Sequence, residues 1–215
     1  FFDLFVLLVS KAYWHWTFFH TQTDFSFCFK PYLLFSIILC TCDPIGMAKM
    51  RQILVIGNND NGCTPELEKI AYDAGKEIAA SNSVLITGGL GGVMKAASHG
   101  AKDGGGLTIG IIPQDDSSLA NEFCDIVIPS GMGLSRDFLN ALSADGVIVV
   151  GGGSGTLSEI CAAYMYKKPI ATLKNSGGMA TKYSDQFLDH RENVKIVGFD
   201  SPKEAVDYIL EQINS

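Results

Sequence analysis

The sequence predicts an α/β fold, a doubly wound, Rossmann-like parallel sheet of about seven strands with helices on both faces. Short apolar runs and amphipathic helical segments alternate through residues 47–215, which is the pattern of βαβ units. The apolar runs are continuous, as expected for parallel strands that are covered on both faces. Two of the runs lead into glycine-rich loops and then into helical sequence. In such folds, ligands bind outside the carboxyl ends of the strands.

The individual elements follow from local signals. Residues 52–57 are a short apolar run that ends in a glycine and an Asn-Asn-Asp-Asn-Gly turn, so a strand is expected there. Thr64 is a suitable N-cap, and Pro65 suits the first turn of a helix expected over residues 64–81. Similar signals predict strands at 84–89, 107–113, 125–130, 146–150, 169–174 and 193–199, and helices at 93–105, 135–145, 156–168 and 201–213.

The composition changes sharply near residue 46. Residues 1–46 hold both tryptophans, most of the aromatic residues and one of the 23 glycines, Gly46. Their longest charge-free apolar run, 31–42, is shorter than the roughly 20 residues that a membrane-spanning helix needs. We expect this hydrophobic, aromatic-rich extension to lie outside the fold; a hydrophobic leader and a structural element are the alternatives. Residues 47–215 are expected to form a single nucleotide- or phosphate-binding domain without membrane association.

Charge and cysteine content limit the function classes. The formal net charge is −7, which disfavours binding of nucleic acid through a broad basic surface. The six cysteines include no Cys-x-x-Cys pair, so we expect no metal site. The same pattern indicates reduced, buried thiols and therefore a cytoplasmic protein.

Two glycine-rich loops are the candidate phosphate-binding elements. They contain, in the first loop, Gly88, Gly89, Gly91 and Gly92, and in the second, Gly152, Gly153, Ser154, Gly155 and Thr156. Each loop precedes an expected helix, whose free N–H groups and partial positive charge favour an anion such as phosphate. Glycine also lets successive N–H groups form a concave nest. Neither loop has a Walker A or a complete dinucleotide motif, and tight turns that serve only packing are the alternative.

Glu159 and Arg136 are the candidate catalytic residues. Glu159 follows the second loop by about one helical turn, where a carboxylate could hold the hydroxyls of a ribose phosphate. The alternative is a capping box, in which Glu159 accepts a hydrogen bond from the backbone N–H of Thr156. Arg136 follows a strand at the start of a helix and could bind a phosphate in bidentate fashion. Here the alternative is an ordinary surface ion pair with Asp137 or Asp185.

Together these motifs resemble the LOG-like family, whose members were once labelled lysine decarboxylases. Several of them hydrolyse the N-glycosidic bond of nucleoside 5′-monophosphates. The family pattern Gly-Gly-x-Gly-Thr-x-x-Glu is matched by residues 152–159, and Arg136 matches the arginine of its upstream Met-x-x-Arg-Lys pattern.

The chain departs from the LOG-like pattern at three positions. Gly151 stands where the pattern has proline, Gly133 where it has methionine, and Asp137 where it has lysine. The departures at Asp137 and Gly151 make the chain similar to a divergent branch, the molybdenum-cofactor carrier proteins, which share the fold but bind rather than hydrolyse.

The resemblance implies a phosphate-anchored protein with two candidate functions. As a hydrolase, it would release a base and ribose 5-phosphate; Glu159 would stabilise positive charge at the anomeric carbon, and Arg136 would orient the phosphate or the base. As a carrier or sensor, it would bind a phosphorylated pterin or a nucleotide without turnover. A structural protein with a vestigial site is the third hypothesis. No cofactor is expected to be required, no lysine stands out for pyridoxal chemistry, and a homodimer or larger homo-oligomer is implied.

Overall fold

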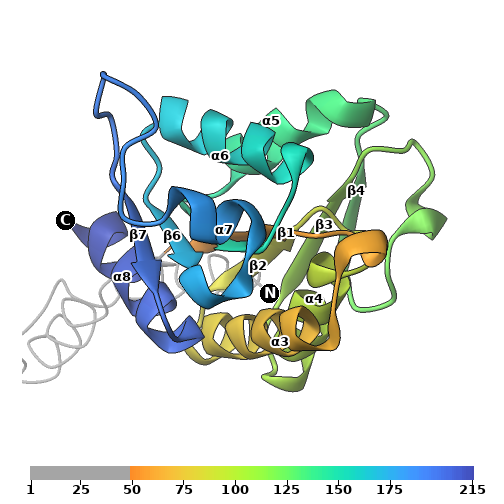
Figure 1. Cartoon of the computed structure of the whole chain (residues 1–215). Coiled ribbons are helices and arrows are strands. Elements are labelled where there is room, and N and C mark those ends of the chain that lie inside the picture. The colour runs from red at the N-terminus through yellow and green to blue at the C-terminus, as the bar shows by residue number, and fades with distance from the viewer. Residues whose placement is uncertain (1–48) are drawn as a thin grey trace, which may run out of the picture. The chain divides into compact units, whose positions relative to one another are not determined.

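The computed structural model describes residues 49–215; the predicted N-terminal extension lies outside the described residues. The described residues form a seven-stranded parallel sheet with helices on both faces (Figure 1), which confirms the predicted fold class. The strands are β1 (Gln52–Gly57), β2 (Val84–Thr87), β3 (Thr108–Ile112), β4 (Ile126–Pro129), β5 (Gly146–Val150), β6 (Ile170–Leu173) and β7 (Ile196–Phe199). Their order across the sheet is β4-β3-β2-β1-β5-β6-β7.

The helices agree with the sequence pattern in number and place, with one addition. They are α3 (Pro65–Ala80), α4 (Val93–Asp103), α5 (Arg136–Ser143), α6 (Ser154–Met165), α7 (Gly178–Tyr183) and α8 (Pro202–Asn214). Helix α7 has no counterpart among the predicted helices, because a six-residue helix that begins with glycine carries almost no periodic signal. Helix α6 begins two residues before the predicted start at residue 156, because glycine is a poor helix former and gives no helical signal in the first turn.

Helix caps explain two of the boundaries. The hydroxyl of Thr64 accepts a hydrogen bond from the N–H of Leu67 (3.3 Å) and so begins α3, as predicted. Ser201 accepts from the N–H of Glu204 (3.3 Å) in the same way at the start of α8. In both helices proline occupies the first helical position, where its missing N–H leaves no hydrogen bond unmade.

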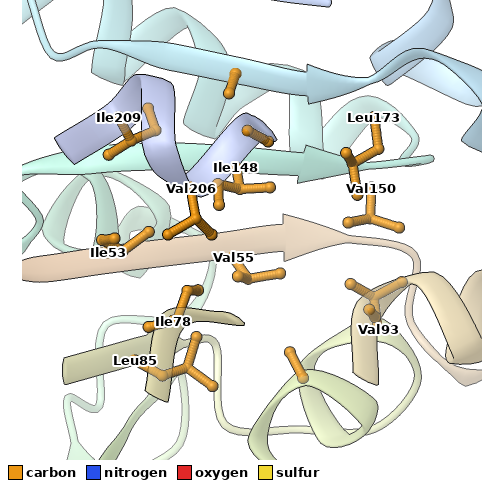
Figure 2. Packing of buried hydrophobic residues seen from close by; sticks show 14 of the residues in the cluster. Ile53, Val55, Ile78, Leu85, Val93, Ile148, Val150, Leu173, Val206 and Ile209 are labelled. Atoms are coloured by element: carbon orange, nitrogen blue, oxygen red, sulfur yellow. The ribbon is translucent and has the colours of Figure 1, made fainter. Parts of the chain in front are cut away.

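The core has two halves, one on each face of the sheet. Alternate residues of β1 point to opposite faces, so Ile53 and Val55 belong to one half while Leu54 and Ile56 belong to the other. The first half is covered by α3, α4 and α8, and the second by α5, α6 and α7. Figure 2 shows the first half, where residues of α8 lie beside Ile148 of β5. Coverage on both faces accounts for the continuous apolar sequence of the central strands. The expectation is wrong for the edge strand β4, where Ile126 and Ile128 are exposed.

Close contact between α3 and α4 depends on two glycines. A Cβ atom added at Gly75 would collide with the backbone oxygen of Ala97, and one added at Gly100 would collide with the backbone oxygen of Tyr72. The two helix backbones therefore approach more closely than larger side chains would allow.

The strand order creates a topological switch point at the centre of the sheet. β1 pairs with β2 on one side and with β5 on the other, both in parallel register. The connections that follow β1, β2 and β5 therefore emerge side by side at the carboxyl edge, and the chain diverges there to opposite faces. Both glycine-rich loops are among these connections.

We predict that a chain starting at Met47 unfolds at the same temperature as the full chain. The reason is that β1 begins at Gln52 and the core of residues 49–215 is built from the sheet and the six helices that cover it. Thermal unfolding of the two proteins measures the difference. A melting temperature lower by about 5 °C or more in the shortened chain would mean that the extension contributes to the stability of the fold.

Candidate functional site

The predicted site residues meet at the carboxyl edge of the sheet. The first glycine loop links β2 to α4, and the second links β5 to α6. Arg136 is the first residue of α5, and Glu159 lies in the second turn of α6. Both are buried, with 8% of their surface exposed. A Cβ atom added at Gly88 would collide with the guanidinium of Arg136, so this arginine lies directly against the first glycine loop.

The N–H groups that begin the second loop already have partners within the protein. Gly151 and Gly152 adopt positive φ angles of 62° and 97°, a conformation that favours glycine. The N–H of Gly151 donates to Oγ of Ser176 (2.7 Å), and the N–H of Gly152 donates to Oδ1 of Asn58 (2.5 Å). Gly152, a predicted phosphate-binding residue, therefore has no free N–H for a ligand in this structure.

The N–H groups at the start of α6 are open. The first helical hydrogen bond of α6 runs from the N–H of Leu157 to the oxygen of Gly153 (3.0 Å), so the N–H groups of Ser154, Gly155 and Thr156 precede it. No side chain caps this helix. Gly153, Ser154 and Gly155 are exposed, and a Cβ atom added at either glycine would meet no atom within 4 Å. An uncapped helix start with exposed residues is the arrangement that a phosphate site requires, although Thr156 itself is buried; the phosphate site stays a prediction.

The first loop differs, because the protein places its own carboxylate there. Oδ1 of Asp60 accepts a hydrogen bond from the N–H of Gly92 (2.7 Å), the residue before α4. The same carboxylate lies directly over Gly91, where an added Cβ atom would collide with it. The N–H of Gly89 donates to Oγ1 of Thr87 (3.1 Å). The positive end of α4 is thus covered by a negative charge from within the chain.

Glu159 is held by a partner that the sequence analysis did not anticipate. Nδ2 of Asn140 donates to Oε1 of Glu159 at 2.8 Å. Burial raises the pKa of Glu159 from 4.5 to about 7; the hydrogen bond from Asn140 and the charge of Arg136 act against this increase, while the charge of Asp137 adds to it. The carboxyl group is therefore present in both protonation states near neutral pH.

The capping-box alternative for Glu159 is wrong. α6 begins at Ser154, so Thr156 is its third residue rather than its N-cap. The hydroxyl of Thr156 donates to the backbone oxygen of Gly57 (3.2 Å), which ties α6 to the end of β1. Glu159 bonds to Asn140 of α5 instead of the backbone N–H of Thr156.

Arg136 does not form an ordinary surface ion pair. Its Nε lies 4.0 Å from Oδ1 of Asp137, at the limit for an ion pair, and both side chains are largely covered. Oδ1 of Asp185, the other proposed partner, accepts from the N–H of Gly198 (3.0 Å). Within residues 49–215, Nε of Arg136 is buried without a hydrogen-bond partner. A buried guanidinium with an unused donor can stabilise an anion nearby.

The sequence profile of the SLOG cluster4 family matches residues 50–206. The chain belongs to the SLOG cluster4 family. Two relatives are similar to this chain. A protein of Archaeoglobus fulgidus is 41% identical over 162 residues, which cover 75% of this chain and 96% of that protein. A rice protein named as a probable cytokinin riboside 5′-monophosphate phosphoribohydrolase is 25% identical over 167 residues, 74% of this chain and 71% of that protein.

Two solved structures resemble this SLOG cluster4 protein. The molybdenum cofactor binding protein of Rippkaea orientalis is 35% identical, with a TM-score of 0.67 over 78% of this chain and 99% of that one. The molybdenum cofactor carrier protein of Chlamydomonas reinhardtii is 29% identical, with a TM-score of 0.66 over 77% of this chain and 99% of that one. The predicted resemblance to LOG-like proteins and to molybdenum-cofactor carriers is confirmed.

Besides Asp60 at the first glycine loop, three residues that contact the site were missed in the sequence. Asn140 follows Arg136 by four residues on α5, so the two side chains share one helix face, and this spacing was the available signal. Asn58 and Ser176 lie far from residue 152 in the chain. Nothing in the local sequence of Asn58 or Ser176 indicates that either side chain meets the second glycine loop, because only the folded sheet brings them together.

The prediction of buried thiols is partly wrong. Cys63, Cys124 and Cys161 are free thiols; Cys63 and Cys124 are half-buried, and Cys161 is exposed on α6. The other three cysteines lie outside the described residues. Among residues 49–215, no cluster of three or more His, Cys, Asp or Glu side chains could hold a metal, and no helix is long and apolar enough to cross a membrane. The cytoplasmic location stays a prediction.

We predict that Glu159→Gln stabilises the protein at pH 8 and has little effect near pH 4. The pKa of Glu159 is about 7 in the folded protein and about 4.5 when exposed, so the folded state binds the proton more tightly. Stability therefore falls as the pH rises from about 4.5 through 7, by up to about 3 kcal/mol. Glutamine stays neutral and can still accept from Asn140.

Thermal unfolding of both proteins between pH 4 and 8 tests this linkage. Glu211→Gln is the control, because Glu211 is exposed on α8. A melting-temperature difference between Glu159→Gln and the wild type that does not change with pH would contradict the raised pKa.

Proposed function

We propose that this protein binds a phosphorylated small molecule at the start of α6 and carries it without turnover. A phosphorylated pterin of the molybdenum-cofactor kind is the favoured ligand. The observation that carries the proposal is the contrast between the two glycine loops. The positive end of α4 is covered by Asp60, whereas the start of α6 has no capping side chain and residues 153–155 are exposed.

Charge and geometry at α6 suit a phosphate. A phosphate oxygen can accept from several first-turn N–H groups at once, and the helix dipole stabilises its charge. The buried guanidinium of Arg136, at the start of α5, adds positive charge near Glu159, which lies in the second turn of α6. The exposed residues 153–155 leave room for the rest of the ligand to extend into solvent, which is useful to a protein that must deliver its ligand.

The environment of Glu159 favours a carrier over a hydrolase. Glycosidic hydrolysis through a cationic transition state needs an ionised carboxylate in contact with the sugar. Glu159 is 8% exposed, its carboxyl oxygen is bonded to Asn140, and Asp137 adds a negative charge nearby. Two solved carrier or cofactor-binding structures, at 29% and 35% identity, also resemble this chain more closely in sequence than the rice relative does at 25%.

Hydrolysis of nucleoside 5′-monophosphates is the second candidate. One observation favours it: a carboxyl group with a pKa of about 7 lies near Arg136 on the helix that follows the open glycine loop. About half of such groups are ionised at neutral pH, so a carboxylate is present to stabilise a developing cation. Substrate binding would have to uncover Glu159 for it to touch a ribose.

We predict that inorganic phosphate and AMP raise the melting temperature of the wild type and that Gly155→Val removes this effect. A Cβ atom at position 155 meets no protein atom within 4 Å, so we expect the fold to tolerate valine there, and we expect the branched side chain to crowd an anion at the first turn of α6. A ligand that binds only the folded state stabilises it.

Lys203→Val is the matched control, because residue 203 is also the second residue of a helix and is exposed. Differential scanning fluorimetry of the three proteins gives the comparison. A Gly155→Val protein that folds and still responds to phosphate would place the anion elsewhere.

We predict that the wild type releases no free base from purine or pyrimidine nucleoside monophosphates, and that Glu159→Gln keeps its affinity for the phosphorylated ligand. Base release is followed by chromatography, alongside calorimetric binding of a phosphorylated pterin and of AMP. Base release by the wild type, at a rate that falls by about 10²–10³-fold in Glu159→Gln, would contradict the carrier proposal and support the hydrolase. A fall of this size is what removal of one preorganised charge produces.

We also propose that the protein forms a homodimer or larger homo-oligomer through α5. Leu134, Phe138 and Leu142 follow each other at four-residue intervals and are 88%, 54% and 52% exposed. A row of exposed apolar side chains is unusual on a monomer and is typical of a surface that contacts another protein.

We predict that Phe138→Asp converts the oligomer to a monomer in sedimentation experiments, whereas Lys203→Asp does not. A wild type that sediments as a monomer would contradict this proposal.

A further inference from the structure

Residues 57–62 run from the last residue of β1 into the turn after it and are called here the bridging loop. We propose that the bridging loop directs the ligand's phosphate to α6 instead of α4. This inference rests on the proposed function, since it concerns the same anion site. Asn58 and Asp60 are the specificity-determining residues. Asn58 places a neutral hydrogen-bond acceptor at the second glycine loop, and Asp60 places a charged acceptor at the first.

The bridging loop touches both glycine loops at the switch point of the sheet. Towards α6, Oδ1 of Asn58 accepts from the N–H of Gly152 (2.5 Å), and the oxygen of Gly57 accepts from the hydroxyl of Thr156 (3.2 Å). Towards α4, the backbone oxygen of Asn58 accepts from the N–H of Val93 (2.9 Å). One short segment therefore sets the position of both loops.

The two side-chain acceptors differ in charge. Asp60 brings a carboxylate to the N–H of Gly92 at 2.7 Å, where it compensates the positive end of α4 and repels a second anion. Asn58 satisfies the N–H of Gly152 with an amide oxygen, which carries no net charge. The first turn of α6 has neither an acidic residue nor a capping side chain, so its N–H groups remain available to an external anion; Asp137 reaches α6 only beyond that turn's first residues, at the hydroxyl of Ser158 (2.6 Å).

Asparagine and aspartate have nearly the same shape, so exchanging them isolates the charge. In Asn58→Asp the acceptor for Gly152 is kept while a negative charge is added beside the phosphate site. In Asp60→Asn the acceptor for Gly92 is kept while the charge is removed. The double variant restores the overall charge but places the carboxylate next to α6, so it separates the position of the charge from its total amount.

The experiment is an NMR titration of the full chain with inorganic phosphate and with AMP. Backbone amide shifts of residues 153–156 report binding at α6, and those of residues 91–93 report binding at α4. We expect the wild type to respond at 153–156 only. Asn58→Asp should weaken this response by about tenfold or more, and the loss should shrink as NaCl is added, because the effect is electrostatic. A purely structural role of Asn58 would give no such salt dependence.

The double variant should stay as weak as Asn58→Asp at residues 153–156. In Asp60→Asn, the amide shifts of residues 91–93 should respond at high phosphate concentration. If Asn58→Asp does not fold, this Asp60→Asn result decides, and unchanged shifts at residues 91–93 overturn the inference. The inference is also overturned if Asn58→Asp binds like the wild type, if the double variant recovers full binding, or if the wild type responds at 91–93. A wild type that responds at neither helix overturns the proposed function together with the inference.

Discussion

The site depends on the central position of β1, which is hydrogen-bonded to β2 on one side and to β5 on the other. Ile53, Leu54, Val55 and Ile56 are buried on alternate faces, so this strand cannot shift by a residue without exposing apolar side chains to the wrong surroundings. Its fixed end carries Asn58 and Asp60 to the edge of the sheet. Each glycine loop takes one of its hydrogen-bond partners from that end, Gly92 from Asp60 and Gly152 from Asn58.

The two glycine loops have similar sequences but different electrostatic environments. At α4 the carboxylate of Asp60 occupies the position that an external anion would take. At α6 the uncharged oxygens of Ser176 and Asn58 accept only from N–H groups that precede the helix. We therefore propose the uncapped first turn of α6 as the anion site of the protein. The neighbouring Arg136 and Glu159 are buried between α5 and α6, where low polarity strengthens the effect of each charge on the other.

Much of this was predictable from local sequence. Continuous apolar strands, the Thr64-Pro65 start of α3 and the Ser201-Pro202 start of α8 predicted the fold because each signal acts within a few residues. The glycine loops, Arg136 and Glu159 were recognised from their spacing. The contacts that local sequence did not predict join segments that are distant in the chain. They are the contacts of Asp60 with Gly91, Asn58 with Gly152 and Asn140 with Glu159, which form only when the sheet brings these segments together. The short helix α7 and the glycine-rich first turn of α6 failed because their propensities are weak.

The central claim is that an external anion binds at α6 and not at α4. The most direct measurement is a crystal structure of the protein grown with a phosphorylated ligand, refined well enough to place each phosphate oxygen. The account predicts phosphate oxygens about 2.7–3.2 Å from the backbone nitrogens of residues 154–156, with Asp60 still bonded to Gly92. A phosphate at the start of α4 with Asp60 displaced, or no phosphate at either helix at saturating ligand, would contradict it.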